Sequence, residues 1–155
     1  MKKPCKRIIT FSLVLCMALS VFTGVVYAAD TDTVVILYEN DVHCAVEGYS
    51  KLAAMKKELS ETYTNVGVVS VGDFVQGGTL GAVSKGEYIV NLMNKVGYDA
   101  IALGNHEFDY GVDTLAAMLK KAKFDIVCAN YDVTNSPLEG IVKPYTIIRR
   151  NGIKI

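Results

Sequence analysis

Four short, largely apolar runs constrain the fold of this chain more than any other feature. They lie at residues 33–38, 66–71, 99–103 and 125–128. The first run, TVVILY, is unbroken, which is typical of a strand buried on both faces of a parallel or mixed sheet. The segments between the runs carry apolar residues at helical spacing. The resulting order βαβαβαβ predicts an α/β fold with right-handed crossovers.

Local signals mark the ends of the three predicted helices. We expect Ser50 to cap the first helix and Asp113 to cap the third. Ser84 and Glu87 fit a capping box at the start of the second helix. Gly97 stands where that second helix is expected to stop.

A hairpin is predicted at the end of the chain. Residues 145–149 and 153–155 are expected to pair, joined at Asn151-Gly152, which is a strong signal for a tight turn. The sequence stops inside the second of these strands. We therefore expect it to be truncated, with residues 29–155 forming the N-terminal portion of a larger domain.

The first 28 residues have the layout of a secretory signal peptide. Basic residues open the chain, an uncharged apolar run covers residues 8–26, and the small residue Ala28 stands at the expected cleavage position. An uncleaved membrane anchor is the alternative, because the run approaches the length that spans a bilayer. Cleavage would leave a protein without a membrane segment that is secreted, periplasmic or associated with the cell envelope.

Loss of this leader makes the chain acidic. The leader carries four of the 16 basic residues and no acidic one, so 12 basic residues remain against 16 acidic residues, a net charge of −4. An acidic domain has no electrostatic footprint for nucleic acid, and we exclude that class of partner. The sequence does not indicate an oligomeric state.

Two cysteines, Cys44 and Cys128, lie beyond the leader. Two scattered thiols are too few for a cysteine zinc site. A disulfide between them is compatible with an exported protein. The sequence alone does not place them within bridging distance, so the pairing stays open.

Polar clusters follow the first three predicted strands. They are Glu39-Asn40-Asp41-Val42-His43, then Gly72-Asp73-Phe74-Val75-Gln76-Gly77, and then Gly104-Asn105-His106-Glu107-Phe108-Asp109. Ligands of open α/β sheets bind beyond the carboxyl ends of the strands, so these clusters are the candidate site.

The residue types in these clusters suit a metal site. Asp41 and His43 are two residues apart, a spacing that in an extended chain points both side chains the same way. Asp73 offers two carboxylate oxygens and can bridge two cations, and Asn105 offers a neutral amide oxygen. Mixed nitrogen and oxygen ligands suit zinc, manganese or iron.

Each cluster taken alone has an ordinary structural explanation. An Asp-x-His pair arises by chance, and Gly-Asp at a strand end is often only a turn. Asn105 is equally a common turn residue. Short motifs of this kind carry a real false-positive rate. Three clusters after three successive strands are much harder to attribute to chance.

The ordered set of motifs resembles the first three signature blocks of the calcineurin-like metallophosphoesterases. These blocks are Asp41-Val42-His43, Gly72-Asp73 followed by Gly77, and Gly104-Asn105-His106-Glu107. The longer string from Gly104 to Gly111 is similar to the branch that contains secreted 5'-nucleotidases and 2',3'-cyclic-nucleotide phosphodiesterases. The resemblance runs from about residue 33 to the end of the sequence and implies a metallophosphoesterase α/β sandwich.

Roles follow from this resemblance, position by position. Two divalent metal ions are implied, the first held by Asp41 and His43, with Asp73 bridging both. Asn105 would bind the second ion and contact the substrate phosphate. His106 would be the catalytic histidine, also near the phosphate, and Asp109 would orient and charge its ring. The role of Glu107 stays open.

Some features depart from the family pattern. The family completes its two-metal site with histidines from later blocks, whereas this sequence has no histidine after His106. The C-terminal nucleotide-binding domain of the family is also absent. Cys44 stands where relatives often have glycine, and it either packs as a small residue or binds metal.

The resemblance implies a metal-dependent phosphoester hydrolase of the 5'-nucleotidase type, acting on extracellular nucleotides or other small phosphate esters. The sequence as given is expected to have little or no activity, because its second metal site is incomplete. One alternative is a related hydrolase of other specificity, a cyclic-nucleotide phosphodiesterase or a sulfur-ester hydrolase. The other is a non-catalytic, truncated product.

Overall fold

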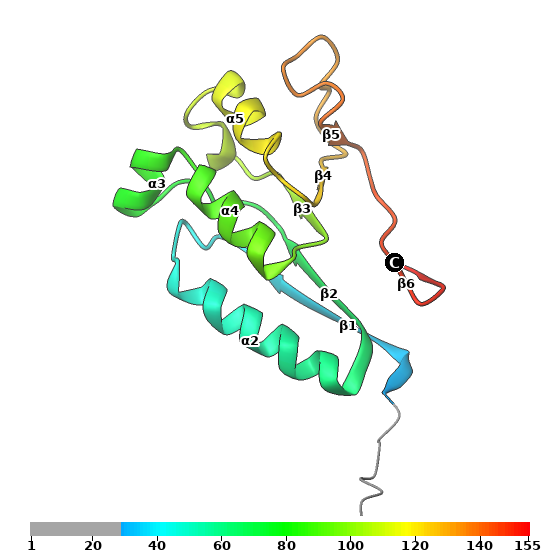
Figure 1. Cartoon of the computed structure of the whole chain (residues 1–155). Helices are drawn as coiled ribbons and strands as arrows, with labels where there is room; N and C mark the ends of the chain where they lie inside the picture. Colours follow the sequence, from blue (N-terminus) through cyan, green and yellow to red (C-terminus); the bar gives the residue numbers. More distant parts are fainter. Residues whose placement is uncertain (1–28) are drawn as a thin grey trace, which may run out of the picture.

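Five parallel strands form the central sheet, and they lie side by side in their order along the chain (Figure 1). The computed structural model describes residues 29–155, so the predicted leader lies outside the described residues. The expected α/β architecture is confirmed. The strands are β1 (Asp30–Glu39), β2 (Tyr63–Ser70), β3 (Ala100–Ala102), β4 (Asp125–Val127) and β5 (Val142–Lys143).

The helices gather on one face of this sheet (Figure 1). Parallel neighbours need a crossover, and crossovers of one hand bring consecutive helices to the same side. The short helix α3 and the strand β5 were not predicted. The helices are α2 (Glu47–Thr62), α3 (Gly78–Ser84), α4 (Glu87–Val96), the 3-10 turn η1 (His106–Phe108) and α5 (Val112–Leu119).

The predicted helix caps are wrong at the N-termini. Helix α2 already begins at Glu47, so Ser50 lies inside its first turn and its hydroxyl donates to the Glu47 carbonyl. Ser84 is the last residue of α3, and its hydroxyl donates to the Leu80 carbonyl at 2.6 Å instead of capping α4. Serine hydroxyls inside a helix commonly bond back to the preceding turn.

Glycines take the cap positions that polar residues were expected to fill. Gly86 precedes α4 with φ 87°, and Gly111 precedes α5 with φ 84°, so Asp113 falls within the first turn of α5. Such backbone angles are readily adopted only by glycine. The predicted stop at Gly97 is confirmed, because this residue is left-handed and its N–H bonds to the Met93 carbonyl at 2.9 Å.

The prediction that residues 33–38 are buried on both faces is wrong. Ile36 is 37% exposed and Tyr38 is 71% exposed. Strand β1 is an edge strand, and the helices cover one face of the sheet (Figure 1). Leu37 of this strand packs against the core. The neighbouring β2 lies inside the sheet, and its Val66 and Val68 are buried as expected.

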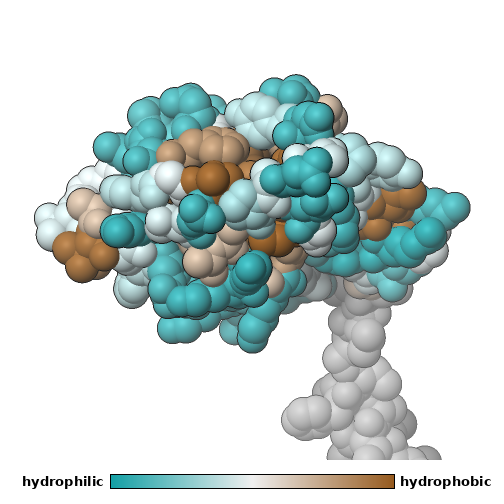
Figure 2. All heavy atoms as spheres, turned by 90° about the horizontal axis from the view of Figure 1, so that it is seen from above, coloured by the Kyte–Doolittle hydropathy of each residue, from teal (hydrophilic) through white to brown (hydrophobic). Residues whose placement is uncertain are grey.

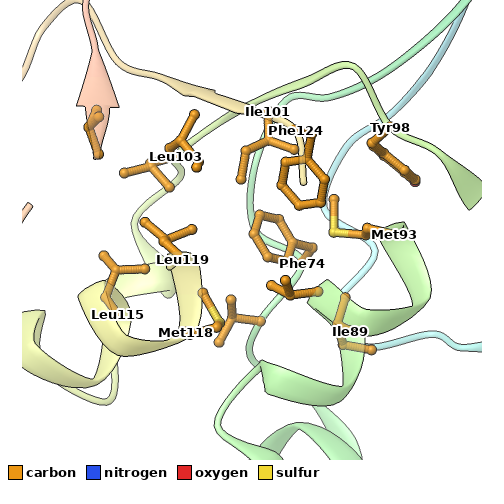
Figure 3. Close-up of a cluster of buried hydrophobic side chains, with 14 of the residues drawn as sticks. Phe74, Ile89, Met93, Tyr98, Ile101, Leu103, Leu115, Met118, Leu119 and Phe124 are labelled. Atoms are coloured by element: carbon orange, nitrogen blue, oxygen red, sulfur yellow. The ribbon is translucent and has the colours of Figure 1, made fainter. Parts of the chain in front are cut away.

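The core lies between the sheet and the helices, and it anchors the loop that follows β2. Phe74 and Val75 of that loop are fully buried. Figure 3 shows Phe74 among Ile89 and Met93 of α4 and Met118 of α5. Because protein interiors are close-packed and hardly compressible, these buried side chains hold the backbone of the loop in place.

The predicted hairpin is present, with shorter strands than expected. Strands β6 (Arg149–Arg150) and β7 (Ile153–Lys154) pair antiparallel, whereas residues 145–148 are not in a strand. Asn151 and Gly152 both have positive φ, as a two-residue turn of this type requires. The Asn151 amide donates to Asn65 Oδ1 of β2 at 3.0 Å, and Arg150 pairs with Asp99, which directly precedes β3. These contacts attach the hairpin to the central sheet.

The surface carries several separate apolar patches within a largely hydrophilic surround (Figure 2). One lies at the tip formed by α3, where Leu80 and Val83 are exposed. Among residues 29–155, no helix has both the length and the apolar character needed to cross a membrane.

Candidate metal and catalytic site

Two loops run side by side beyond the carboxyl ends of β1 and β2. The Asp41 N–H donates to the Gly72 carbonyl at 3.1 Å, and the His43 N–H donates to the Asp73 carbonyl at 3.0 Å. These bonds continue the pairing of the two strands into the loops. The first two polar clusters of the sequence are therefore joined through their backbones.

Asp41, His43 and Asp73 form the candidate metal triad. One ligand atom from each residue lies within 4.8 Å of the other two, so a single ion fits between them. The three residues have positive φ values of 55°, 43° and 56°. Asp41 and His43 therefore converge through left-handed turns, and the extended conformation expected from their spacing is wrong. Asp and His are among the residues that tolerate this conformation best.

The His43 ring is oriented by the backbone. Its Nδ1 lies 3.0 Å from the Gln76 carbonyl, which can only accept a hydrogen bond, so Nδ1 carries the proton. In the neutral ring Nε2 is then the nitrogen without a proton, and it lies 3.8 Å from Asp41 Oδ1, on the side of the triad. Metal-binding histidines usually donate their other ring N–H in this way, which fixes the tautomer needed for coordination.

Three glycines allow the loops to approach closely. A Cβ at Gly77 would lie 2.1 Å from the His43 carbonyl oxygen, and one at Gly104 would lie 2.3 Å from Asp73 Oδ1. A Cβ at Gly72 would lie 2.5 Å from the Gly104 nitrogen. Larger residues at these positions would push the triad apart.

His106 lies next to the triad. Its ring centroid is 5.0 Å from that of His43, and its backbone N–H donates to Asp73 Oδ1 at 2.8 Å. Its ring Nδ1 is 2.7 Å from Asp109 Oδ2. This hydrogen bond is the main reason why the pKa of the His106 imidazole is raised.

Asn105 precedes His106 and is exposed. It lines a cavity of about 550 Å³, whose wall also includes Phe108 and Tyr131. The rings of Phe108 and Tyr131 meet edge to face, with centroids 5.4 Å apart. The structure thus brings Asp41, His43, Asp73, His106 and Asp109 into one site and places Asn105 at its margin.

Glu107 is the residue whose role the sequence left open. It is 1% exposed, and its two carboxylate oxygens accept four backbone N–H groups. The sequence showed only that Glu107 follows two candidate site residues, Asn105 and His106. That position does not distinguish a metal ligand from a residue that holds the loops together.

Cys44 packs in the interior. Its side chain is buried and its thiol donates to the Val75 carbonyl at 2.7 Å. Burial raises the pKa of this thiol to about 11, so it stays protonated at neutral pH and is a poor metal ligand. Cys44 and Cys128 are both free thiols, so the disulfide that the sequence left open is not formed.

Comparisons with known proteins identify the family to which the chain is similar. The sequence pattern of the family described as calcineurin-like phosphoesterase matches residues 34–154. A snake venom 5'-nucleotidase from Gloydius brevicauda is 36% identical over 90% of this chain and 26% of its own length. The trifunctional nucleotide phosphoesterase protein YfkN of Bacillus subtilis (strain 168) is 35% identical over 74% of this chain and 9% of its own.

A solved structure shows the same fold. The crystal structure of a 5'-nucleotidase precursor from Thermus thermophilus superimposes with a TM-score of 0.74 at 29% identity, over 78% of this chain and 27% of that one. The chain spans about a quarter of the length of the 5'-nucleotidases that it matches.

Proposed function

The chain belongs to the calcineurin-like phosphoesterase family, and on that premise we propose that it carries the first metal ligands and the catalytic histidine of a nucleotide phosphoester hydrolase. The observation that carries the proposal is the convergence of Asp41, His43 and Asp73 around a space that fits one ion. Similarity to 5'-nucleotidases supports a nucleotide as the substrate class.

The donor set fits a divalent ion of the zinc, manganese or iron type, since it combines two carboxylates with one imidazole. Asp41 and His43 would hold the first ion, Asp73 would bridge to a second, and Asn105 would bind that second ion. Divalent ions supply such a site with a water of lowered pKa and with positive charge against the phosphate.

His106 would act on the leaving group. Asp109 accepts a hydrogen bond from Nδ1–H, which leaves Nε2 free to contact the substrate phosphate and to give a proton to the departing oxygen. The raised pKa of the imidazole keeps its charged form present at higher pH, which favours this acid role. Asn105 would contact the same phosphate.

Export is the second part of the proposal. The layout of residues 1–28 supports cleavage after Ala28 and action on nucleotides outside the cytoplasm. N-terminal sequencing of protein recovered from culture medium or periplasm should begin near Ala29. An intact N-terminus in the membrane fraction would contradict cleavage and favour an anchor.

The metal site can be tested directly on this chain. We expect calorimetric titration with Mn²⁺ to show one weak site, because three protein ligands leave positions for water. Asp73→Ala should abolish binding, whereas Glu58→Ala, at an exposed carboxylate of α2, should not change it. Binding that survives Asp73→Ala, or two tight equivalents per chain, would overturn the ligand assignment.

The substrate class should be tested on the longest form of the protein that its gene encodes. We expect that form to release phosphate from nucleoside 5'-monophosphates. Preference for a 2',3'-cyclic nucleotide or for a sulfur ester would support the related specificities instead. Absence of hydrolysis with every substrate, despite bound metal, would support a non-catalytic product.

A further inference from the structure

Glu107 carries a buried carboxylate, because the residue is only 1% exposed. A buried carboxylate is costly unless its oxygens are fully hydrogen-bonded. Here the partners come from two separate loops. Oε1 accepts the N–H groups of Phe74 and Val75 at 2.9 and 3.3 Å, and Oε2 accepts those of Asp73 and Gly104 at 2.9 and 2.6 Å.

These four hydrogen bonds use the lone pairs of both carboxylate oxygens, so Glu107 is not available as a metal ligand. Both oxygens face backbone donors, and an ionised carboxylate is an acceptor only. Bonds from N–H groups to a charged acceptor are about twice as strong as neutral ones. Glu107 therefore joins the loop after β2 to the loop after β3.

These hydrogen bonds also reach the metal triad, through Asp73. The Asp73 backbone N–H is held by Glu107, while Asp73 Oδ1 accepts the His106 N–H at 2.8 Å. Asp73 also has a left-handed backbone, with φ 56°, which needs support from its surroundings. Without the Glu107 carboxylate, the N–H groups of Phe74 and Val75 would be left unpaired in a buried place, and that of Asp73 in a half-buried one.

We propose that Glu107 is a positioning residue, which sets the metal affinity of the triad by fixing the backbone of Asp73. This inference extends the proposed function, but it concerns the geometry of the ligands and not the reaction. A merely structural role would lower the stability of the fold without changing the affinity of folded protein for metal.

The specific chemistry of the side chain makes the proposal testable. Glu107→Gln keeps the shape, but it replaces one acceptor oxygen by an NH₂ group that faces two backbone N–H donors. Loss of a group that orients a metal ligand typically costs on the order of 10–100-fold in affinity, and we expect that loss here. The probe is Mn²⁺, titrated calorimetrically well below the unfolding temperature.

A matched control separates positioning from stability. Val142→Ala removes a buried side chain from β5, which contributes no residue to the triad. It should lower the unfolding temperature while leaving the Mn²⁺ dissociation constant within about twofold of wild type. Folded Glu107→Gln protein with an affinity in that same range would overturn the proposal.

Amide hydrogen exchange on the wild-type chain gives a second measurement that needs no variant. The N–H groups of Asp73, Phe74, Val75 and Gly104 should exchange as slowly as core amides of β2, because all four bond to one buried carboxylate. Exchange at the rate of exposed loop amides would overturn the proposal, even if Glu107→Gln failed to fold. If wild-type protein bound no Mn²⁺, the metal function would fail, and exchange would still decide whether Glu107 fixes Asp73.

Discussion

Asp109 Oδ2 lies 2.7 Å from Nδ1 of His106, across a single 3-10 turn. The two residues are three apart, so the turn that sets the backbone of His106 also delivers its partner. Because Nδ1 is engaged, any chemistry of this imidazole runs through Nε2. The sequence suggested this pair only through family resemblance, and the structure supplies its geometry.

The first prediction concerns this pair and is made for the longest encoded form of the protein. His106→Ala should leave the metal content unchanged and should lower kcat on the order of 10²–10⁴-fold, the usual contribution of a positioned acid or base. Asp109→Asn should cost less, because it disturbs only the orientation and charge of the ring. Metal analysis and steady-state kinetics provide the measurements.

Leaving groups provide the control for that prediction. Nitrophenolate departs without a proton, so the loss in His106→Ala should shrink for a nitrophenyl ester. Release of metal by His106→Ala, or an equal loss for good and poor leaving groups, would show that His106 is a ligand or a structural residue.

The second prediction concerns the close approach at Gly104. A methyl group there would lie 2.3 Å from Asp73 Oδ1, so Gly104→Ala should weaken Mn²⁺ binding at least about tenfold. The control is Gly48→Ala in α2, where nothing lies within 4 Å of the added Cβ. That variant should keep its affinity and gain about 0.5 kcal/mol of stability. Equal affinities in the two variants would argue against a sterically defined site.

The third prediction concerns the pH dependence of stability. The pKa of Asp125 is lowered by hydrogen bonds from Lys143 and Thr146, so the contribution of Asp125 to stability is fully present above its ordinary pKa of 3.8. It is lost as the pH falls through the lower folded-state pKa. Asp125→Asn should therefore cost up to about 1 kcal/mol at pH 7, since the pair is half-exposed, and less at pH 2.

Urea unfolding at pH 7 and at pH 2 measures this difference. Glu58→Gln, which removes an exposed carboxylate of α2, should be nearly neutral at both values. A cost of Asp125→Asn that stayed constant from pH 7 to pH 2 would mean that ionisation of Asp125 does not contribute.

The fourth prediction concerns thiol chemistry. Cys44 is buried, and its pKa of about 11 leaves very little thiolate at pH 8. Iodoacetamide should therefore leave Cys44 unmodified in native protein and alkylate it rapidly in urea. Peptide mass spectrometry should likewise find no peptide that links Cys44 to Cys128. Fast native labelling would contradict the packed position.

Local patterns were sufficient for the alternation of strands and helices along the chain, the stop at Gly97 and the turn at Asn151. Each depends on residues close in sequence. Helix starts were not predictable in the same way, because Ser84 bonded back into α3 and a left-handed glycine took its expected place. The exposure of Tyr38 depends on which face of the sheet the helices cover, and no run of six residues encodes that.

The sequence likewise predicted some parts of the candidate site and not others. Asp41, His43 and Asp73 were named from their residue types and from their place after strands. The role of Glu107 was not, because its four donors come from two loops about 30 residues apart in the chain. The tautomer of His43 depends on the Gln76 backbone, whose position has no signature in the sequence.

The close packing of Gly72, Gly77 and Gly104 also bears on how such a site can diverge. The three ligand side chains are held by a frame that contains no side chain at its tightest points. Exchanging one ligand for another donor would leave that frame intact, so metal preference can change by single substitutions. No other residue can replace these glycines without moving the loops, since even alanine adds a carbon atom where none fits. We expect metal identity to drift between lineages while the glycine frame persists.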